Sequence, residues 1–532
     1  MSRIWLVKAG NPISYNYSIG GDSLRKKTRF PPLGDSHSGS SSIPREQKLR
    51  DKLDDNEAIV RSIFDRCSDL VVRRLLLPGS VTCMAVYLNA LVDDAQWSDG
   101  LLKPLMTLKT DQLEDRSKLL EWLRTRIDST IQPHAAETLN EVVRSIVSGG
   151  VALFFESYSF ALTVKIRNQL HRALEEPKTE AVIRGPRIGF IEKIEINLTL
   201  LRQHIQSPQL KIERMTVGTV TGTEVAVVYL DKLAPSDVIR EVKSRLSRIQ
   251  MDSVLGTGYI EEMISDHPYS PFPIINTTER PDSAAGSLLE GKVAVLVNGT
   301  PLVMIMPVTF WFGFQSAEDY YMNFIFATML RWLRFLFAFL AVAAPSLYVA
   351  VTTFHQEMIP TSLALSLVTA REIVPFPTMV ETLIMEVTFE ALREAGVRLP
   401  RAVGQTISIV GALVIGQAAV QAGIISAPII IVVSLTGIAS FLIPQPGMSQ
   451  AISIFRFPMV ICAGTFGLYG VSAGMIAILI HLSNLQSFGF PYLWPVTPYN
   501  RAGVMDVLFR APWRLMYKRR QLAQRDSEVP NP

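Results

Sequence analysis

The stretch EIVPFPTMVETLIMEVTFEALREAGVRLP, residues 372–400, decides how the rest of the chain is interpreted. It is apolar enough to lie in a membrane, yet it is charged along much of its length. Its charged side chains after the PFP segment are Glu381, Glu386, Glu390, Arg393, Glu394 and Arg398. Charges at bilayer depth are costly and usually functional. The stretch is therefore either a surface helix of a soluble protein or a polar helix inside a membrane assembly.

Charge is distributed unevenly over the 532 residues, which are 48% hydrophobic and only 19% charged. Soluble domains carry roughly 25% charged residues. Residues 402–455 and 457–500 contain no Asp, Glu, Lys or Arg, and about 20 apolar residues are enough for a helix to cross a bilayer. The sequence therefore predicts a membrane-embedded second half.

The remaining bulk features exclude several classes of protein. A net charge of +4 is too small to indicate nucleic acid binding. The three cysteines, Cys67, Cys83 and Cys462, have no disulfide or zinc spacing and suit a reducing compartment. The start, MSRIWLVKAG, has no signal-peptide pattern. We therefore expect the first 300 residues or so to stay in the cytosol.

The first half is predicted to be α+β, in two small subdomains at 51–180 and 181–315. A flexible extension at 1–50 precedes them, in which residues 31–44 are rich in Pro, Gly and Ser. Residues 151–166, VALFFESYSFALTVKI, indicate two strands around a tight turn. Asn298-Gly299 between two apolar runs is a strong hairpin signal. Amphipathic helices are expected at 111–127 and 234–249.

Residues 316–500 are predicted to form an all-α polytopic membrane domain with four to six crossings. The expected crossings are 335–353, 404–422, 426–443 and one or two more within 451–485, where four glycines permit close packing or a break. Arg331 and Arg334 are interpreted as flanking cations on the cytoplasmic side. The tail, 501–532, is basic and is expected to face anionic lipid headgroups in the cytoplasm.

The charged stretch itself has the signs of one helix at about 378–395. Thr378 followed by Glu381 is a capping-box pattern, so Glu381 is interpreted first as a cap residue. At about 100° per residue, one polar arc is shared by five side chains. They are Thr382, Glu386, Glu390, Arg393 and Glu394. The helix lies flat at the interface with its carboxylates in water, or it turns the arc toward a water-filled cavity or pore that attracts cations.

Motifs for catalysis, metals and cofactors are weak. GSLLEGKV from Gly286 nearly matches a phosphate-binding loop, but Val293 replaces the Ser or Thr that holds magnesium. HQEMI at His355 lacks the second histidine of a zinc motif, and no GxSxG occurs. We therefore predict no enzyme activity, no metal site and no cofactor.

Several stretches together resemble the GerA family, the A subunits of bacterial spore germinant receptors. They are EAVIRGPRIGFIEKIEINLTLLRQHI (180–205), LEGKVAVLVNGTPLVMIMPVTF (289–310), TTFHQEMIPTSL (352–363), VPFPTMVETLIMEVTFEALREAGVRLP (374–400) and FGFPYLWPVTP (488–498). The resemblance covers about 50–520. Its motif residues are Gly185, Pro186, Arg187, Pro375, Phe376 and Pro377.

The resemblance implies a multi-pass protein of the inner membrane of an endospore, with its N-terminal domain and tail on the cytoplasmic (spore core) side. It implies a homo-oligomeric, channel-forming subunit that turns nutrient binding into release of monovalent cations. The implied partners are a transporter-like B subunit that binds the nutrient and a lipoprotein C subunit. Glu386, Glu390, Arg393 and Glu381 are then the ion-path candidates.

The sequence departs from the family at two places. Ile188 stands where relatives usually carry an acidic residue, and IPQPGMSQ (443–450) replaces a segment that tends to hold a Tyr-Glu pair. These departures keep open a sibling branch, the SpoVAF-like proteins, which amplify ion release without sensing nutrients. A membrane scaffold and a stand-alone transporter are the remaining alternatives.

Overall fold

The structure is a computed structural model. It describes residues 47–78, 81–107, 133–166, 176–177, 179–180, 182–398 and 416–512. Four of the predicted segments lie wholly or mostly outside these ranges: the extension at 1–50, the helix at 111–127, the crossing at 404–422 and the tail at 501–532.

The first α+β unit is an antiparallel sheet of five strands in the order β1-β2-β4-β5-β3. The strands are β1 (Leu70–Leu77), β2 (Val81–Leu88), β3 (Pro133–Ala136), β4 (Gly150–Phe155) and β5 (Ala161–Lys165). Helix α1 (Leu53–Ile63) precedes β1, and α4 (Leu139–Val147) follows β3. The predicted hairpin at 151–166 is present as β4 and β5.

The second unit repeats this plan. Its strands β6 (Leu210–Val217), β7 (Thr223–Leu230), β8 (Asn276–Thr278), β9 (Val293–Val297) and β10 (Val303–Met306) have the order β6-β7-β9-β10-β8, the same relative order as in the first sheet. A helix again precedes the first strand and another follows the third: α5 (Ile194–His204) and α8 (Pro281–Leu289). The predicted hairpin is present as β9 and β10, and Gly299 supplies the positive φ of 92° in its turn.

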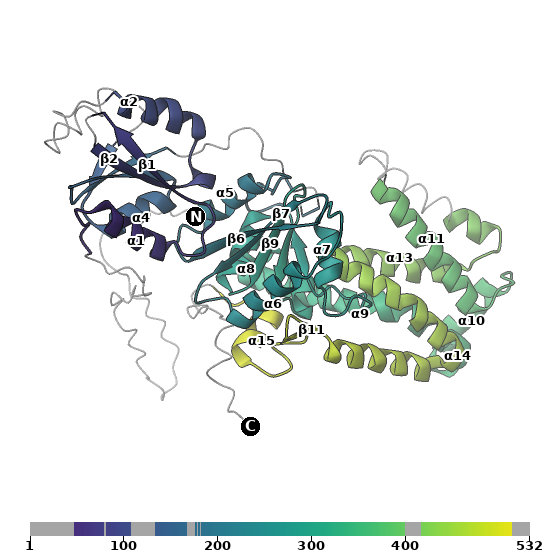
Figure 1. Ribbon diagram of the computed structural model, residues 1–532. Coiled ribbons are helices and arrows are strands. Elements are labelled where there is room, and N and C mark those ends of the chain that lie inside the picture. Colours follow the sequence, from purple (N-terminus) through teal and green to yellow (C-terminus); the bar gives the residue numbers. More distant parts are fainter. Residues whose placement is uncertain are drawn as a thin grey trace, which may run out of the picture. The chain divides into compact units, whose positions relative to one another are not determined.

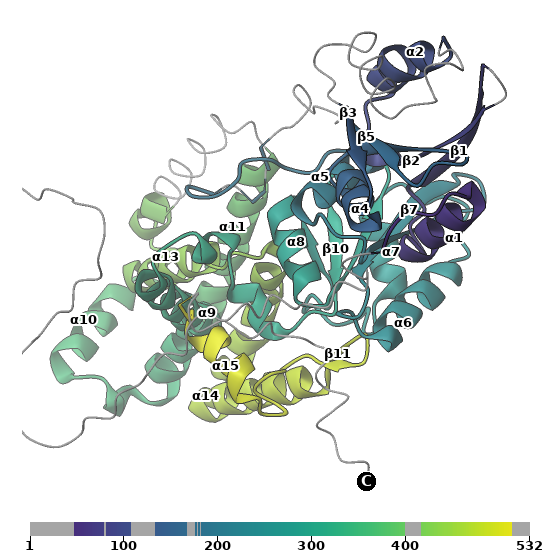
Figure 2. The same ribbon diagram turned by 90° about the vertical axis from the view of Figure 1, so that its left-hand side faces the viewer.

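Helices cover both faces of the second sheet (Figure 2). Helices α5 and α8 pack with Ile212, Val228 and Leu296 on one face. Helices α6 (Ser236–Ser247) and α7 (Thr257–Ile264) lie on the other, where Val242 and Leu246 of α6 are buried as the amphipathic pattern predicts. Strands β9 and β10, VAVLV and VMIM, are accordingly apolar on both sides.

A buried ion pair joins the two units. Asp69 accepts two hydrogen bonds of 2.9 Å from Arg202 of α5, and both side chains are at most 1% exposed. Cys67 beside it forms a parallel bridge to Ile212 of β6. The bidentate geometry compensates for the removal of both charges from water.

The helical region follows the two sheets (Figure 1). Its helices are α9 (Phe324–Phe354), α10 (Thr361–Arg371), α11 (Thr378–Arg398), α13 (Ala427–Phe441) and α14 (Pro446–Asn484), and the short α15 (Arg501–Leu508) ends it. Among the described residues, α9 and α14 are the two helices long and apolar enough to cross a membrane. The predicted crossing at 335–353 lies inside α9.

Helix α14 is two antiparallel arms rather than one rod (Figure 1). Its chain breaks at Gly467, where φ is 59° and ψ is −142°. A Cβ added at Gly470 would lie 2.1 Å from the Cys462 carbonyl oxygen, and one at Gly474 would lie 2.4 Å from the Met459 sulfur. Residues this far apart in sequence touch only if the chain folds back, so the glycines predicted to permit a break do form one.

The ends of α14 define two ends of the helical region. Both arms start or finish near residues 270–273: Gly447 lies beside Pro273, and the His481 ring is 2.9 Å from the Ser270 hydroxyl. We call this the proximal end. The tip at Gly467 lies beside Phe354 and His355, where α9 finishes, and we call this the distal end.

Candidate functional site

The predicted ion-path residues lie on α11, which runs antiparallel to the first arm of α14. Met379 at its start packs on Gly464 near the distal end. Farther along, the Arg393 guanidinium donates a 3.1 Å hydrogen bond to the Ser453 hydroxyl. The Pro375-Phe376-Pro377 motif directly precedes the helix, and the Pro377 carbonyl accepts a hydrogen bond from the first-turn amide of Glu381. The motif therefore sets where α11 begins.

Glu386 forms a buried ion pair with Arg456. Its carboxylate lies 2.7 Å from the Arg456 guanidinium, and the two side chains are 1% and 2% exposed. The Thr436 hydroxyl of α13 lies 3.5 Å from the other carboxylate oxygen. The pair is neutral as a unit, which is how two charges are tolerated at this depth.

Arg456 also donates a hydrogen bond to a backbone carbonyl of α9 that lacks its usual helical partner. Pro345 has no N–H, so it leaves the carbonyl of Ala341, four residues earlier, without its helical partner. The Arg456 Nε–H donates a 3.0 Å hydrogen bond to that carbonyl. One side chain therefore ties α14 to both α9 and α11. The role of Arg456 was not predicted, although it is the only Asp, Glu, Lys or Arg between residues 402 and 500 of the sequence.

Glu381 is a cap, but of another helix. The capping-box pattern predicts a role at the start of α11, yet its carboxylate accepts a hydrogen bond from the Ser426 amide at the start of α13. Its second oxygen lies 3.8 Å from Arg371 Nε. A carboxylate at a helix N-terminus is stabilised by the free N–H groups there.

The shared polar arc of α11 does not open to water as a whole. Thr382 and Glu386 are each 1% exposed and pack against neighbouring helices. Glu390 and Arg393 pair with each other and are partly exposed, at 36% and 18% of their side chains. An assignment of any of them to an ion path stays a prediction.

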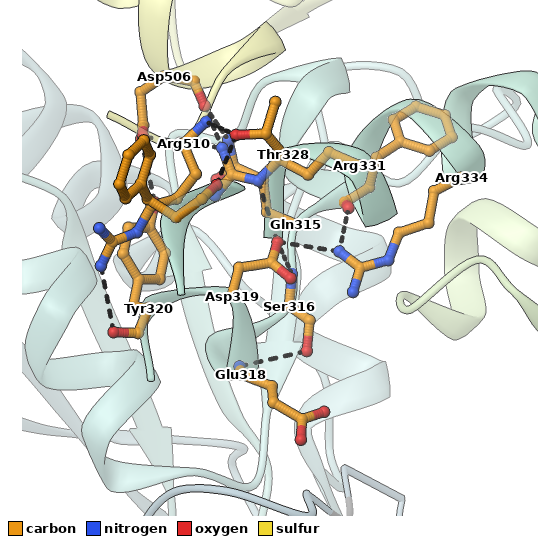
Figure 3. A network of polar contacts seen from close by, with 12 residues as sticks. Gln315, Ser316, Glu318, Asp319, Tyr320, Thr328, Arg331, Arg334, Asp506 and Arg510 are labelled. Atoms are coloured by element: carbon orange, nitrogen blue, oxygen red, sulfur yellow. Dashed lines mark hydrogen bonds and ion pairs between the residues drawn. The ribbon is translucent and has the colours of Figure 1, made fainter. Parts of the chain in front are cut away.

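A second polar network lies where α9 begins (Figure 3). Asp319, which is 0% exposed, accepts hydrogen bonds of 3.0 Å from Arg331 and 2.9 Å from Arg334. Arg331 also reaches Asp506 of α15, at 3.7 Å between Nη1 and Oδ1. Both arginines were predicted to be flanking cations on the cytoplasmic side. Arg331 is 0% exposed and paired with Asp319, so it does not present its charge to lipid headgroups, and the side of the membrane on which the two arginines lie stays a prediction.

Tyr320 and Arg510 complete this network (Figure 3). The Tyr320 hydroxyl donates a 3.0 Å hydrogen bond to Asp506. Burial raises the pKa of Tyr320, so the phenol keeps its proton and remains a donor. Arg510 donates to the Tyr320 carbonyl at 3.2 Å. The network fastens the chain after α14 to the first turns of α9.

The other motif, Gly185-Pro186-Arg187, lies beside the same junction. The Pro186 carbonyl accepts a 3.0 Å hydrogen bond from Arg280, which is itself 2.8 Å from Asp282. Gly185 has a φ of 131°, and a Cβ there would meet the Tyr321 ring at 3.1 Å. Arg187 is more loosely held, at 3.3 Å from Glu176. The motif packs the second sheet's unit against the segment that leads into α9.

The described residues hold no group of three or more His, Cys, Asp or Glu arranged for a metal ion. The near phosphate-loop motif begins inside α8 and runs into β9, so its helix precedes the loop instead of following it. Lys292 in that motif lies 3.1 Å from Glu290. This order of elements presents no helix N-terminus to a phosphate.

Comparison with known proteins gives a consistent result. Residues 58–522 match the family model described as Bacillus/Clostridium GerA spore germination protein. The chain is 43% identical to the uncharacterized membrane protein YfkQ of Bacillus subtilis, over 89% of this chain and 92% of that protein. It is 42% identical to spore germination protein KA of the same organism, over 87% and 85%. It is 38% identical to spore germination protein GerLA of Bacillus cereus, over 88% and 95%.

A solved structure is also similar: the N-terminal domain of the A subunit of the Bacillus megaterium spore germinant receptor GerK3. It is 31% identical, with a TM-score of 0.40, and covers 50% of this chain and 99% of its own. Family membership rests on the match over most of the chain and on the near full-length relatives. The chain belongs to the GerA family of spore germination proteins.

Proposed function

We propose that this chain is the A subunit of a spore nutrient-germinant receptor. In this role it assembles with copies of itself and turns nutrient binding into the release of monovalent cations. The observation that carries the proposal is an apolar helix that the described part of the chain leaves uncovered. None of the eleven residues of α10 is buried, and Leu363, Leu365 and Val368 are 52%, 64% and 66% exposed. Such a helix needs lipid or a second copy to cover it.

The ion path we propose uses the partly exposed end of the polar arc. Glu390 and Arg393 remain accessible from one side of α11, whereas Glu386 is neutralised by Arg456. Glu390 would therefore face a path formed between subunits, and Glu386 would hold α11 in place behind it. Rings of carboxylates at a pore attract cations.

The membrane topology we propose has an even number of crossings. The polar network ties α15 to the start of α9, so the C-terminal segment emerges on the same side as the two sheets. Five helical segments run between the proximal and distal ends: α9, α11, α13 and the two arms of α14. The sequence predicts one further crossing at 404–422. Six crossings result, with the sheets and the tail in the spore core.

The partners in this proposal are a transporter-like B subunit and a lipoprotein C subunit, in the inner membrane of the endospore. A second candidate is the SpoVAF-like role, amplification of ion release without nutrient sensing. It is favoured by the similarity to YfkQ, a relative whose name records a membrane protein and no receptor. Dependence on the B subunit separates the two roles.

The test is potassium efflux from liposomes that contain the purified full chain, with and without its B and C partners. The receptor role predicts efflux that requires the B subunit and a nutrient. Efflux from the chain without a B subunit would favour the sibling role. No conductance under any condition would indicate a scaffold, and saturable uptake of one solute would indicate a transporter.

A Glu390→Gln variant sharpens this test. We expect a lower preference for potassium over chloride, because the variant removes the carboxylate from the proposed path. Glu262→Gln is the matched control, since Glu262 is an exposed carboxylate on α7 in the α+β region. An unchanged ion preference in Glu390→Gln would remove Glu390 from the path.

A further inference from the structure

Four polar atoms meet at the distal end of the helical region, each from a different element. They are the Tyr348 hydroxyl on α9, Arg371 Nε on α10, Glu381 Oε2 on α11 and the Ser426 hydroxyl at the start of α13. Each is buried, and none has a hydrogen-bond partner among the described residues. Tyr348 packs against the buried cluster that contains Ile425 and Ile429, which flank Ser426, and Arg371 Nε lies 3.8 Å from Glu381 Oε2. A buried polar atom without a partner calls for an explanation such as a bound ion or water, and here four such atoms come from four elements.

The carboxylate at this site is held rigidly. Glu381 is 0% exposed. Its first oxygen is fixed by the Ser426 amide, which leaves the second oxygen directed toward Arg371 at 3.8 Å. That distance is an ion pair without a hydrogen bond. Ser426 is 1% exposed, so its hydroxyl is shielded from water beside the amide that binds Glu381.

The cation at this site is held loosely. Arg371 is in the last turn of α10, the helix with no buried residue. Its side chain is 25% exposed, and it lines a cavity of about 500 Å³. The polar residues of that cavity are Thr352, Gln356, Thr369, Arg371 and Glu372. Little packing therefore opposes a movement of α10 that would withdraw Arg371 into the cavity.

Withdrawal of Arg371 leaves Glu381 as a buried carboxylate with no countercharge. Breaking a buried ion pair by removing one partner is strongly unfavourable. Among the described residues, Arg371 is the cation that forms an ion pair with Glu381. A free cation that enters through the cavity, past the exposed Glu372 carboxylate, restores neutrality.

We propose that Glu381, Tyr348 and Ser426 form a binding site for a compact monovalent cation, which Arg371 occupies in the present state as a tethered guanidinium. An alkali ion or a primary ammonium group has the required charge and size. Either could approach all three oxygens, which the planar guanidinium at 3.8 Å does not. The free cation and Arg371 exclude each other. The site does not depend on whether the chain conducts ions.

The test is the unfolding temperature of the full chain in lipid nanodiscs. Potassium, methylammonium and the bulky N-methylglucamine are compared as chloride salts at equal ionic strength. In Arg371→Ala we expect potassium or methylammonium to raise the midpoint by roughly 2–4 °C over N-methylglucamine. A rise with potassium alone identifies an alkali ion, and a rise with methylammonium alone identifies an ammonium group. Arg371→Gln serves in place of Arg371→Ala if the alanine variant does not fold.

Matched variants decide whether Glu381 is the ligand. The double variant Arg371→Ala/Glu381→Gln should lose the rise in unfolding midpoint with potassium or methylammonium. The double variant Arg371→Ala/Glu390→Gln should keep it. Arg371→Lys restores a tethered cation and should show no response. Equal midpoints in all three salts for both Arg371→Ala and Arg371→Gln would overturn the proposal, and so would a response that survives Glu381→Gln.

Discussion

The α+β region and the helical region of this protein have opposite arrangements of polarity. In the second sheet, Val227 and Leu230 are at most 2% exposed, while Arg240 on the covering helix α6 is 78% exposed. In the helices, Ile431 and Phe466 are 69% and 65% exposed, and Glu386 and Arg456 are each 1% exposed. This difference is expected if water surrounds the α+β region and lipid or another subunit covers the helical region.

Buried ion pairs occur in both regions, so burial of charge alone does not distinguish them. Asp69 and Arg202 join the two sheets much as Glu386 and Arg456 join the helices. The distinction lies in what the outside of each region meets. Exposed apolar side chains are tolerated singly in water, but whole helices of them require lipid or another subunit.

The largest effect is expected from Arg456→Gln, which leaves Glu386 buried without its countercharge. We expect the free energy of unfolding of the helical region to fall by about 3–5 kcal/mol. The measurement is the yield of monodisperse protein in detergent, with Arg240→Gln as the exposed control. A yield as high as that of the control would show that the Glu386–Arg456 ion pair does not stabilise the helical region.

A slightly smaller effect is expected when a charge is placed on the outside of each region. Ile431→Asp on α13 should make the free energy of membrane insertion about 2.5–3.5 kcal/mol less favourable. Val220→Asp, at 80% exposure in the α+β region, should be nearly neutral. The amount of each variant recovered in the membrane fraction measures the difference. Equal recovery of the two would mean that the outside of α13 does not meet lipid.

The next effect concerns the hairpin of α14. Gly470→Ala brings a Cβ to 2.1 Å from the Cys462 carbonyl, and we expect a cost of about 1–3 kcal/mol. Gly286→Ala on α8 is the control, because nothing lies within 4 Å of its added Cβ. Thermal unfolding of the two variants compares them. A Gly470→Ala variant as stable as Gly286→Ala would contradict the close approach of the two arms.

The smallest effect is expected at the surface of the first sheet. Arg74 and then Arg61 lower the pKa of Glu57 below its ordinary value of 4.5 through hydrogen bonds. The pair therefore contributes stability above pH 4.5 that is lost as the pH falls through the lowered pKa. Arg74→Ala should be slightly less stable than the wild type at pH 7, with the difference shrinking below pH 4.5 and at high salt. A difference that grows in acid would contradict this sign.

Much of this arrangement was predictable from sequence, because it depends on local patterns. The Asn298-Gly299 turn, the buried face of α6 and the glycine break in α14 each follow from residues within one or two elements. The chain's membership of the GerA family follows from motifs such as Pro375-Phe376-Pro377. The matching strand orders of the two sheets were not predicted, because pairing order depends on contacts between distant strands.

The site was predicted less well, because its partners are distant in sequence. Glu381 caps a helix that begins at residue 427, and a capping-box pattern cannot reveal a partner 45 residues away. Arg331 contacts Asp506, which lies 175 residues further along the chain. The arc containing Glu386 was expected to meet water, whereas Arg456 lies opposite it. Arg456 is the single charged residue in the apolar stretch 402–500, and this isolation was the signal that could have identified it as the partner of Glu386.

The most direct test of the inverted polarity is a double-mutant cycle on Glu386 and Arg456 in lipid nanodiscs. Glu386→Leu and Arg456→Met should each lower the unfolding midpoint strongly, because each leaves a buried charge alone. The double variant should recover most of that loss, because the charges stabilise each other and an apolar pair can fill the same space. Additive losses in the double variant would show that the two side chains act independently, and would contradict the neutral buried pair on which this account depends.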